Sequence, residues 1–296
     1  MQRCIQPRPK ATRLTVAVMT TFLLAMPVHA WADPGTETTD DIQFGIDYTP
    51  PSERDEQSPE AQEHIAEALL TYQTVAGLTA SDQAAIEAEL AELEKDNPEA
   101  VVEAREDAAA KRMSRAAAAV PPTARTFVMT HQKQANGYYC GPATASMIAK
   151  YKGKSYSQAT LAGSTYLKTD ANGATKWALK VMAPTLNEIV GTTEYQQIQS
   201  PTLASLKASF VNNIGANYLP VAVDTYEYAN SAHYNGHPKT KNIGHWIVGH
   251  GYSGSGSTLA FHDPAQGVWS GVTVPETFTY SASGFHQWVT TNGIVA

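Results

Sequence analysis

The sequence contains almost no cysteine: among its 296 residues only Cys4 and Cys140 are cysteines. A disulfide-stapled fold is excluded, because two cysteines form at most one bridge. Long apolar runs are equally scarce. The run from Leu14 to Val28 is too short for a comfortable transmembrane helix, and no later run could span a bilayer. We therefore expect no stable membrane insertion.

The second half of the chain also lacks a stripe of lysine and arginine. Residues 121–296 hold 7 acidic and 11 basic residues, whereas residues 33–120 hold 21 acidic and 6 basic ones. A weakly basic half without clustered bases makes nucleic acid an unexpected partner. The contrast in charge predicts two modules.

The first 32 residues have the pattern of a secretory signal peptide. Four basic residues and no acid precede the apolar run, and small residues fit cleavage after Ala30 or Ala32. An uncleaved anchor is the weaker interpretation. Cleavage would remove Cys4 and leave Cys140 as a lone thiol in an oxidising, extracellular compartment.

Residues 33–58 are rich in Thr, Asp, Pro and Glu and predict a disordered linker. Residues 59–120 have helical apolar spacing, with a start at Ser58-Pro59 and a break at Asn97-Pro98. Two interpretations of this acidic helical segment stay open. It is either a solvated spacer, or a propeptide whose charge matches the basic module and which covers its cleft.

Residues 121–296 predict one catalytic domain of ordinary size. Its helices come first and its strands second, which indicates the α+β class. The expected helices are Cys140–Tyr151, Ser157–Ala162, Pro184–Val190 and residues 200–212. The expected strands are Thr126–His131, Tyr218–Thr225, Gly244–Tyr252 and Thr258–Asp263.

Cys140 has the setting of a nucleophile. Its helix would begin at the cysteine itself, since Pro142 suits a first turn. A thiolate at a helix N-terminus is stabilised by the helix dipole and by free backbone N–H groups. Gly141 would let a substrate approach the backbone closely. The alternative, an inert buried cysteine, fits the flanking residues less well.

The run Gly244–Tyr252 supplies a base for this nucleophile. If the following hairpin loop is centred on Ser255, Ile247 pairs with Asp263, and the alternation of side chains puts His245 and Asp263 on one face. A carboxylate there can orient the imidazole of His245. His250 and His262 then share the opposite face.

Gln134 lies six residues before Cys140 and is a candidate donor to the oxyanion of a tetrahedral intermediate. Asn136 is a weaker candidate, because Asn136-Gly137 is typical of a turn.

The combination Gln-x5-Cys-Gly-Pro-Ala, Gly-His-Trp-Ile-Val and Asp-Pro resembles the papain-like cysteine peptidases. It is most similar to the branch of the bacteriocin-processing (double-glycine leader) peptidases and their secreted stand-alone relatives. The resemblance covers residues 126–270. It implies a papain-like fold with Cys140 as nucleophile, His245 as base, Asp263 as its orienter and Gln134 as oxyanion donor. Tyr139 departs from the acidic residue usual before the cysteine, and no transporter domain is present.

These observations favour a secreted peptidase acting on a peptide or protein, without a cofactor or a metal. Two alternatives stay open: an acyl or peptidyl transferase with the same triad, and an inactive papain-like module that binds a partner at the cell surface. His233 and His237 have the spacing of metal ligands, but they lie in turn-forming sequence and are expected to be polar loop residues near the cleft.

Overall fold

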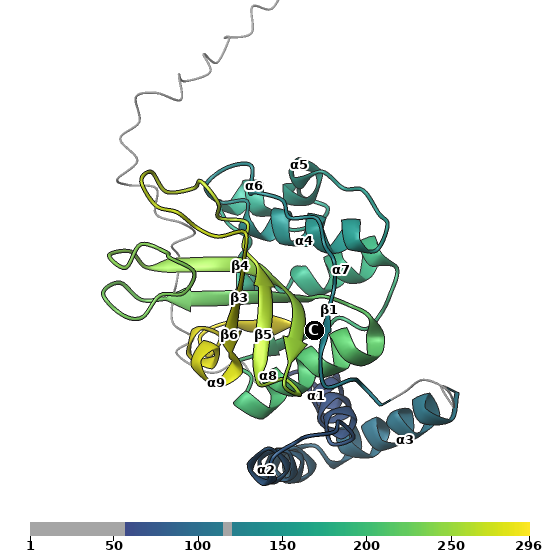
Figure 1. Ribbon diagram of the computed structural model, residues 1–296. Coiled ribbons are helices and arrows are strands. Elements are labelled where there is room, and N and C mark those ends of the chain that lie inside the picture. The colour runs from purple at the N-terminus through teal and green to yellow at the C-terminus, as the bar shows by residue number, and fades with distance from the viewer. Residues whose placement is uncertain (1–56, 115–119) are drawn as a thin grey trace, which may run out of the picture. The chain divides into compact units, whose positions relative to one another are not determined.

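The computed structural model describes residues 57–114 and 120–296, with the side chains of 111–114 left out. The predicted signal peptide and most of the predicted linker lie outside these residues. The described chain is an α+β protein in which helices pack against an antiparallel sheet (Figure 1). Its α-helices are α1 (Pro59–Tyr72), α2 (Ala80–Asp96), α3 (Pro98–Ser114), α4 (Cys140–Tyr151), α5 (Gln158–Ala162), α6 (Thr169–Asn172), α7 (Met182–Val190), α8 (Leu203–Phe210) and α9 (Ala282–Phe285). Shorter or wider helical turns are η2 (Trp177–Leu179), the π-helix η3 (Val211–Asn217) and η4 (His286–Trp288).

Seven strands form the sheet of the described residues, in the order β2-β7-β3-β4-β5-β6, with β1 paired to β4. They are β1 (Arg125–Thr126), β2 (Gln197–Gln199), β3 (Val221–Glu227), β4 (Ile243–Ser253), β5 (Thr258–His262), β6 (Thr277–Ser281) and β7 (Gly293–Val295). All their pairings are antiparallel. This architecture is compatible with a papain-like fold.

The central strands β3 and β4 are buried on both faces because helices cover each side. Ala222 and Val248 belong to the core formed with α4 and α7. Their neighbours Val223 and Ile247 belong to the second core, formed with α8. The alternation of side chains along a strand therefore divides one apolar run between two cores.

The hairpin of β4 and β5 brings His245 and Asp263 to the same end of the sheet. Next to the turn, Ser253 pairs with Thr258, one residue out of the expected register. A bulge between Gly249 and Gly251 restores the expected register, so that Val248 pairs with His262. Since β5 ends at His262, Asp263 follows directly at the position opposite Ile247.

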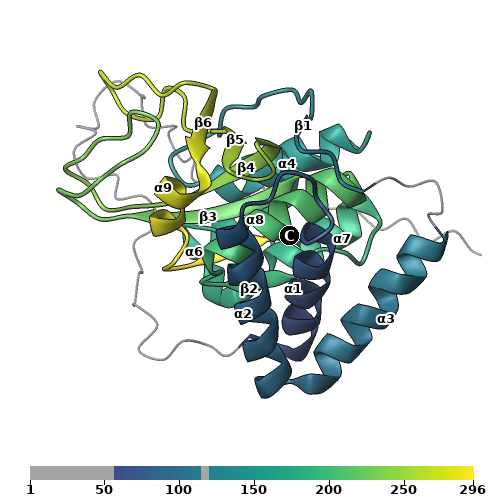
Figure 2. The same cartoon turned by 60° about the horizontal axis from the view of Figure 1, so that its bottom comes forward.

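The three N-terminal helices share a hydrophobic core with the rest of the described chain. Ile65, Leu69 and Tyr72 of α1 are buried in the same cluster as Phe210 of α8 and Phe261 of β5. In Figure 2, α1 lies between α2 and α3. Both α1 and α2 contact α8. The expected helix start at Ser58 and the break at Asn97-Pro98 are both observed.

Polar contacts fix these helices to α8 and to the turn of the β4–β5 hairpin. Tyr72 Oη donates to the carbonyl of Ser255 at 2.8 Å, and Ser255 Oγ donates to the carbonyl of Ala76 at 2.6 Å. Lys207 of α8, itself buried, forms an ion pair with Asp82 of α2. In the described chain the segment is therefore packed against the domain that contains the sheet.

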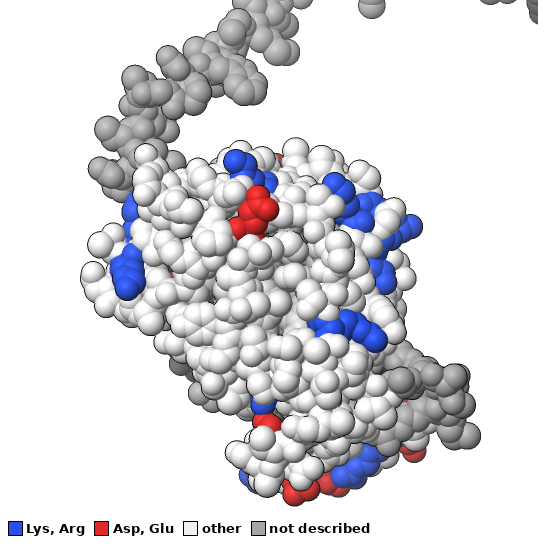
Figure 3. Space-filling view, viewed as in Figure 1, with Lys and Arg blue, Asp and Glu red and all other residues white. Residues whose placement is uncertain are grey.

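Charge is unevenly spread over the surface. In Figure 3 the middle of the face over β3 to β5 is largely uncharged, and acidic and basic side chains gather at its lower end, over α2. No helix in the described ranges is long and apolar enough to cross a membrane.

One expected strand is largely absent. Of residues Thr126–His131 only Thr126 lies in a strand, the two-residue β1. Phe127 still bonds to β4 through the carbonyl of His250, but Val128 is 98% exposed. The chain leaves the sheet there and runs toward Cys140 without regular structure.

Candidate active site

Helix α4 begins at Cys140, as the sequence predicts. Its N-cap residue, Tyr139, makes no side-chain capping bond, so no side chain occupies the first backbone N–H groups of the helix in that way. Cys140 is an unpaired cysteine and is 6% exposed. Its sulfur therefore lies at the positive end of a twelve-residue helix.

The glycine after Cys140 has a different role from the expected one. A Cβ on Gly141 would lie 2.1 Å from Thr175 Oγ1, so this side of the backbone faces Thr175 and not a substrate. Thr175 is held there by Thr169 Oγ1 at 2.6 Å and by Trp246 Nε1, which donates to its carbonyl at 2.8 Å. Gly141 is thus required for close packing of Thr175 against the start of α4.

His245 lies between Cys140 and Asp263. Its Nε2 is 2.8 Å from Oδ1 of Asp263, and Cys140 lies near enough to its side chain to influence its charge. Because Nε2 faces Asp263, the other ring nitrogen, Nδ1, is the one left for the sulfur. The hydrogen bond that the structure gives to this imidazole is the one to Asp263, and Cys140 lies nearby at the start of α4.

The electrostatics of this pair favour a charged histidine. Burial opposes charge on His245, but the carboxylate of Asp263 and the nearby Cys140 outweigh it and raise the pKa of His245 to about 10. Burial likewise opposes charge on Asp263, but His245 and His237 outweigh it and hold the pKa of Asp263 below its ordinary value. An imidazolium beside a carboxylate is the resulting state at neutral pH.

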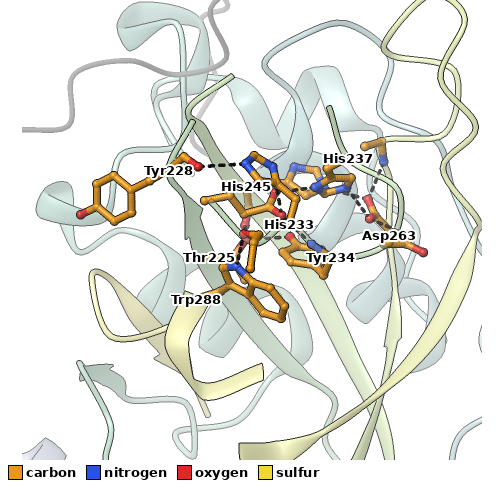
Figure 4. Close-up of polar contacts among 12 residues, drawn as sticks. Thr225, Tyr228, His233, Tyr234, His237, His245, Asp263 and Trp288 are labelled. Atoms are coloured by element: carbon orange, nitrogen blue, oxygen red, sulfur yellow. Dashed lines mark hydrogen bonds and ion pairs between the residues drawn. The ribbon is translucent and has the colours of Figure 1, made fainter. Parts of the chain in front are cut away.

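Four donors surround the carboxylate of Asp263, which is fully buried (Figure 4). Oδ1 accepts from His245 Nε2 at 2.8 Å and from the backbone N–H of Ala265 at 2.9 Å. Oδ2 accepts from Asn235 Nδ2 at 2.8 Å and from His237 Nε2 at 2.9 Å. The position of Asp263 is therefore defined on both oxygens.

His237 and Glu227 were not recognised as site residues from the sequence. His237 was expected to be a polar loop residue, yet it is 3% exposed and touches Asp263. Its Nδ1 lies 2.6 Å from Oε2 of Glu227, a fully buried residue of β3. An acid in a strand as apolar as Val-Ala-Val-Asp-Thr-Tyr-Glu was the one available signal, since a buried charge needs a partner.

Gln134 is buried, and its backbone N–H donates to the carbonyl of Pro264, the residue after Asp263. Its side-chain Nε2 donates to the carbonyl of Asn136 at 2.8 Å, at the start of the turn that leads into Cys140. An amide nitrogen has two N–H groups, so this bond leaves one for another acceptor. Asn136 is a turn residue, as expected: its Oδ1 accepts from the N–H of Tyr138.

One group of side chains in the described ranges has the composition of a metal site. Ligand atoms of His237, His245 and Asp263 lie within 4.8 Å of one another. However, the two nitrogen–oxygen separations are 2.9 and 2.8 Å. Two ligands that share one zinc ion at 2.0–2.2 Å would lie about 3.3 Å apart at a tetrahedral angle. The separations fit hydrogen bonds better than joint ligation.

The fold and the site define an α+β protein with a cysteine at a helix N-terminus and a histidine–aspartate pair on a hairpin beside it. The model of the Peptidase_C39 like family matches residues 126–291, more than half of the chain. The chain therefore belongs to this family, and so to the papain-like cysteine peptidases of the C39 type, which are hydrolases. A search of curated proteins finds no match.

Proposed function

We propose that this protein is a cysteine peptidase that hydrolyses peptide bonds through a thioester acyl-enzyme. Cys140 is the nucleophile, His245 the acid and base, Asp263 its orienter and Gln134 an oxyanion donor. The observation that supports the proposal is the hydrogen bond from His245 Nε2 to Oδ1 of Asp263, with Cys140 close to the same imidazole at the start of α4. Membership of the peptidase family supports the same reaction.

In the first half of the reaction, the thiol proton of Cys140 resides on His245, which Asp263 stabilises as imidazolium. The sulfur attacks the carbonyl carbon of the peptide bond, and the carbonyl oxygen becomes an oxyanion. When this intermediate collapses, the C–N bond breaks and the leaving amine takes the proton from His245. The acyl group remains on Cys140 as a thioester.

In the second half, water replaces the amine. Neutral His245 removes a proton from water, and the resulting hydroxide attacks the thioester carbon. Collapse of the second tetrahedral intermediate breaks the C–S bond, releases a carboxylic acid and returns the proton to the Cys140–His245 pair.

Two groups would stabilise the oxyanion in this mechanism. One is the free N–H of the Gln134 amide, held at the turn before Cys140. The other is the backbone at the start of α4, where no side chain caps the helix. We expect Gln134→Ala to lower kcat by about 10²–10³, the usual effect of losing one oxyanion donor.

We further propose that the enzyme acts outside the cytoplasm. The proposal rests on the signal-peptide pattern of residues 1–32 alone, which lie outside the described part of the chain. Intact mass of the protein recovered from the culture medium tests it: loss of about the first 30–32 residues is expected.

The test of peptidase activity is turnover of casein and of a peptide library by the wild-type protein and by Cys140→Ala. Cleavage that disappears in Cys140→Ala supports the proposal, and equal cleavage by both proteins overturns it. Reaction in ¹⁸O-labelled water separates hydrolysis from transfer. A hydrolase incorporates the label into the new carboxylate, whereas a transferase forms an unlabelled amide with an added amine.

A further inference from the structure

The connection from β3 to β4 (residues 228–242) folds back over the candidate triad and extends it by two residues. His237 lies in this connection and has one ring nitrogen on each of two buried carboxylates. Nε2 is 2.9 Å from Asp263 Oδ2, and Nδ1 is 2.6 Å from Glu227 Oε2. All three side chains are fully buried, so water does not supply an alternative partner for these atoms.

These contacts define the protonation of His237. A carboxylate oxygen can only accept, so both nitrogens of His237 must donate, and only the imidazolium carries both protons. Burial disfavours that charge, but Asp263 and Glu227 outweigh it and raise the pKa of His237. The imidazolium of His237 is thus compensated on both sides by negative charge.

Glu227 is itself held by its surroundings. Its second oxygen, Oε1, accepts the backbone N–H of Tyr234 at 2.8 Å and lies 3.5 Å from Nδ1 of His233. Tyr234 Oη in turn lies 2.7 Å from Thr225 Oγ1 on β3. The turn before His237 needs left-handed backbone at Asn235 and Gly236, and a Cβ on Gly236 would lie 2.8 Å from the carbonyl of Thr273. The connection therefore has little freedom to move.

We propose that Glu227 and His237 are positioning residues of the active site, which fix the carboxylate of Asp263 and set the strength with which it holds the proton on His245. The proposal rests on the proposed catalytic roles of Asp263 and His245. The cationic His237 bonds to Oδ2 and withdraws negative charge from Asp263. Asp263 therefore stabilises the imidazolium of His245 less strongly than it would if all its other donors were neutral. Glu227 limits this effect by balancing the charge of His237.

The titratable groups that face His237 come from several elements. They are Glu227 of β3, His245 of β4, Asp263 after β5 and Tyr234 of the same connection, with His233 and Cys140 one contact further on. Of these, only Glu227 and Asp263 bond directly to the imidazole ring of His237.

The decisive variant is Glu227→Gln in the full chain. Neutral His237 can then still donate from Nε2 to Asp263 while Nδ1 accepts from the new amide, so the hydrogen bonds persist and two charges disappear. The double variant Glu227→Gln/His237→Gln keeps a neutral chain of amides and avoids the isolated buried carboxylate that His237→Gln alone would leave. Glu276→Gln is the matched control, because its carboxylate is half exposed and only its backbone contacts Asp263.

The main measurement is the alkylation rate of Cys140 by iodoacetamide from pH 5 to 12, followed by mass spectrometry, which needs no substrate. We expect the alkylation rate of the wild type to show an inflection at high pH, where His245 loses its proton. We expect this inflection to move upward by about one pH unit or more in Glu227→Gln and in the double variant, and to stay in place in Glu276→Gln. A folded Glu227→Gln protein with an unmoved inflection overturns the proposal.

Two further readouts separate positioning from mere stability. With a substrate in hand, kcat of Glu227→Gln should fall by about 10–100-fold, in the range found for residues that orient a first ligand, with KM little changed. NMR of ¹⁵N-histidine-labelled wild type should show protons on both ring nitrogens of His237 at pH 7. A single proton there overturns the proposal even if every variant fails to fold. If the inflection moves as expected but no peptide is cleaved, the peptidase assignment fails, whereas the coupling of Glu227 and His237 to His245 and Cys140 stands.

Discussion

Truncation of Leu69 tests whether the N-terminal helices are part of the folded domain. Leu69 of α1 is fully buried in the cluster that also contains Phe210 and Phe261. Leu69→Ala removes buried methyl groups and leaves a cavity, which costs about 2–5 kcal/mol at such positions. With a urea m-value of about 3 kcal/mol/M for a domain of this size, a loss of about 3 kcal/mol lowers the unfolding midpoint by about 1 M.

The chain has a convenient reporter for this experiment. Its five tryptophans are Trp31, Trp177, Trp246, Trp269 and Trp288, and none lies within residues 57–114. In a Trp31→Phe background, tryptophan fluorescence therefore reports only on residues 120–296. If α1 shares one cooperative core with the sheet, Leu69→Ala must shift the fluorescence transition by the full amount.

Val102→Ala is the control for this substitution. Val102 lies on α3 and is 48% exposed, so its truncation should change the free energy of unfolding by less than about 0.5 kcal/mol. The reasoning is refuted if Leu69→Ala leaves the tryptophan transition unchanged while circular dichroism detects a separate, earlier loss of helix. Residues 57–114 would then fold apart from the rest, as a spacer or a removable propeptide would.

Four other perturbations have defined outcomes. Gly141→Ala forces its new methyl group into Thr175, and we expect peptidase kcat to fall by at least about tenfold, measured beside the overall melting temperature. The raised pKa of His245 stabilises the folded state. This contribution is complete below about pH 6.5, the pKa of histidine in the unfolded chain, and is lost as the pH rises toward about 10. The difference in melting temperature between wild type and His245→Gln should therefore shrink from pH 6 to pH 10. The lowered pKa of Asp263 gives stability present above about pH 4 and lost in stronger acid, so Asp263→Asn should cost less as the pH falls through that range. Peptidase activity should survive prolonged dialysis against EDTA, and its loss with recovery on added Zn²⁺ would contradict the hydrogen-bonded interpretation of His237, His245 and Asp263.

Local sequence rules predicted the elements that carry the candidate triad. The helix at Cys140 has the expected bounds because Pro142 fits its first turn and apolar residues fill its buried face. The two strands of the hairpin are near their expected positions, because alternation and β-branched residues are local signals. The register at Asp263 was correct only because the bulge at His250 offsets a turn that begins one residue later than assumed.

What sequence reasoning missed depends on contacts between distant residues. Glu227 and His237 meet because the 228–242 connection folds back, and no local pattern specifies that. The short strands β2 and β7 are paired with each other across nearly a hundred residues, and neither has the length or alternation that identifies a strand. The apolar spacing of residues 59–120 predicts helices, but the surface that buries Leu69 could not be read from its own helix.

The hairpin links the N-terminal helices to the chemistry. At the turn of β4 and β5, Ser255 is bonded to Tyr72, the last residue of α1, and to Ala76 in the turn that follows it. At the other end of the same two strands lie His245 and Asp263, whose shared face depends on the register between the strands. A one-residue slip in the hairpin would turn Asp263 away from His245, and contacts that fix the turn oppose such a slip. Helices that do not touch the candidate triad thus contribute to its geometry, so their removal is expected to impair the enzyme and not to release it.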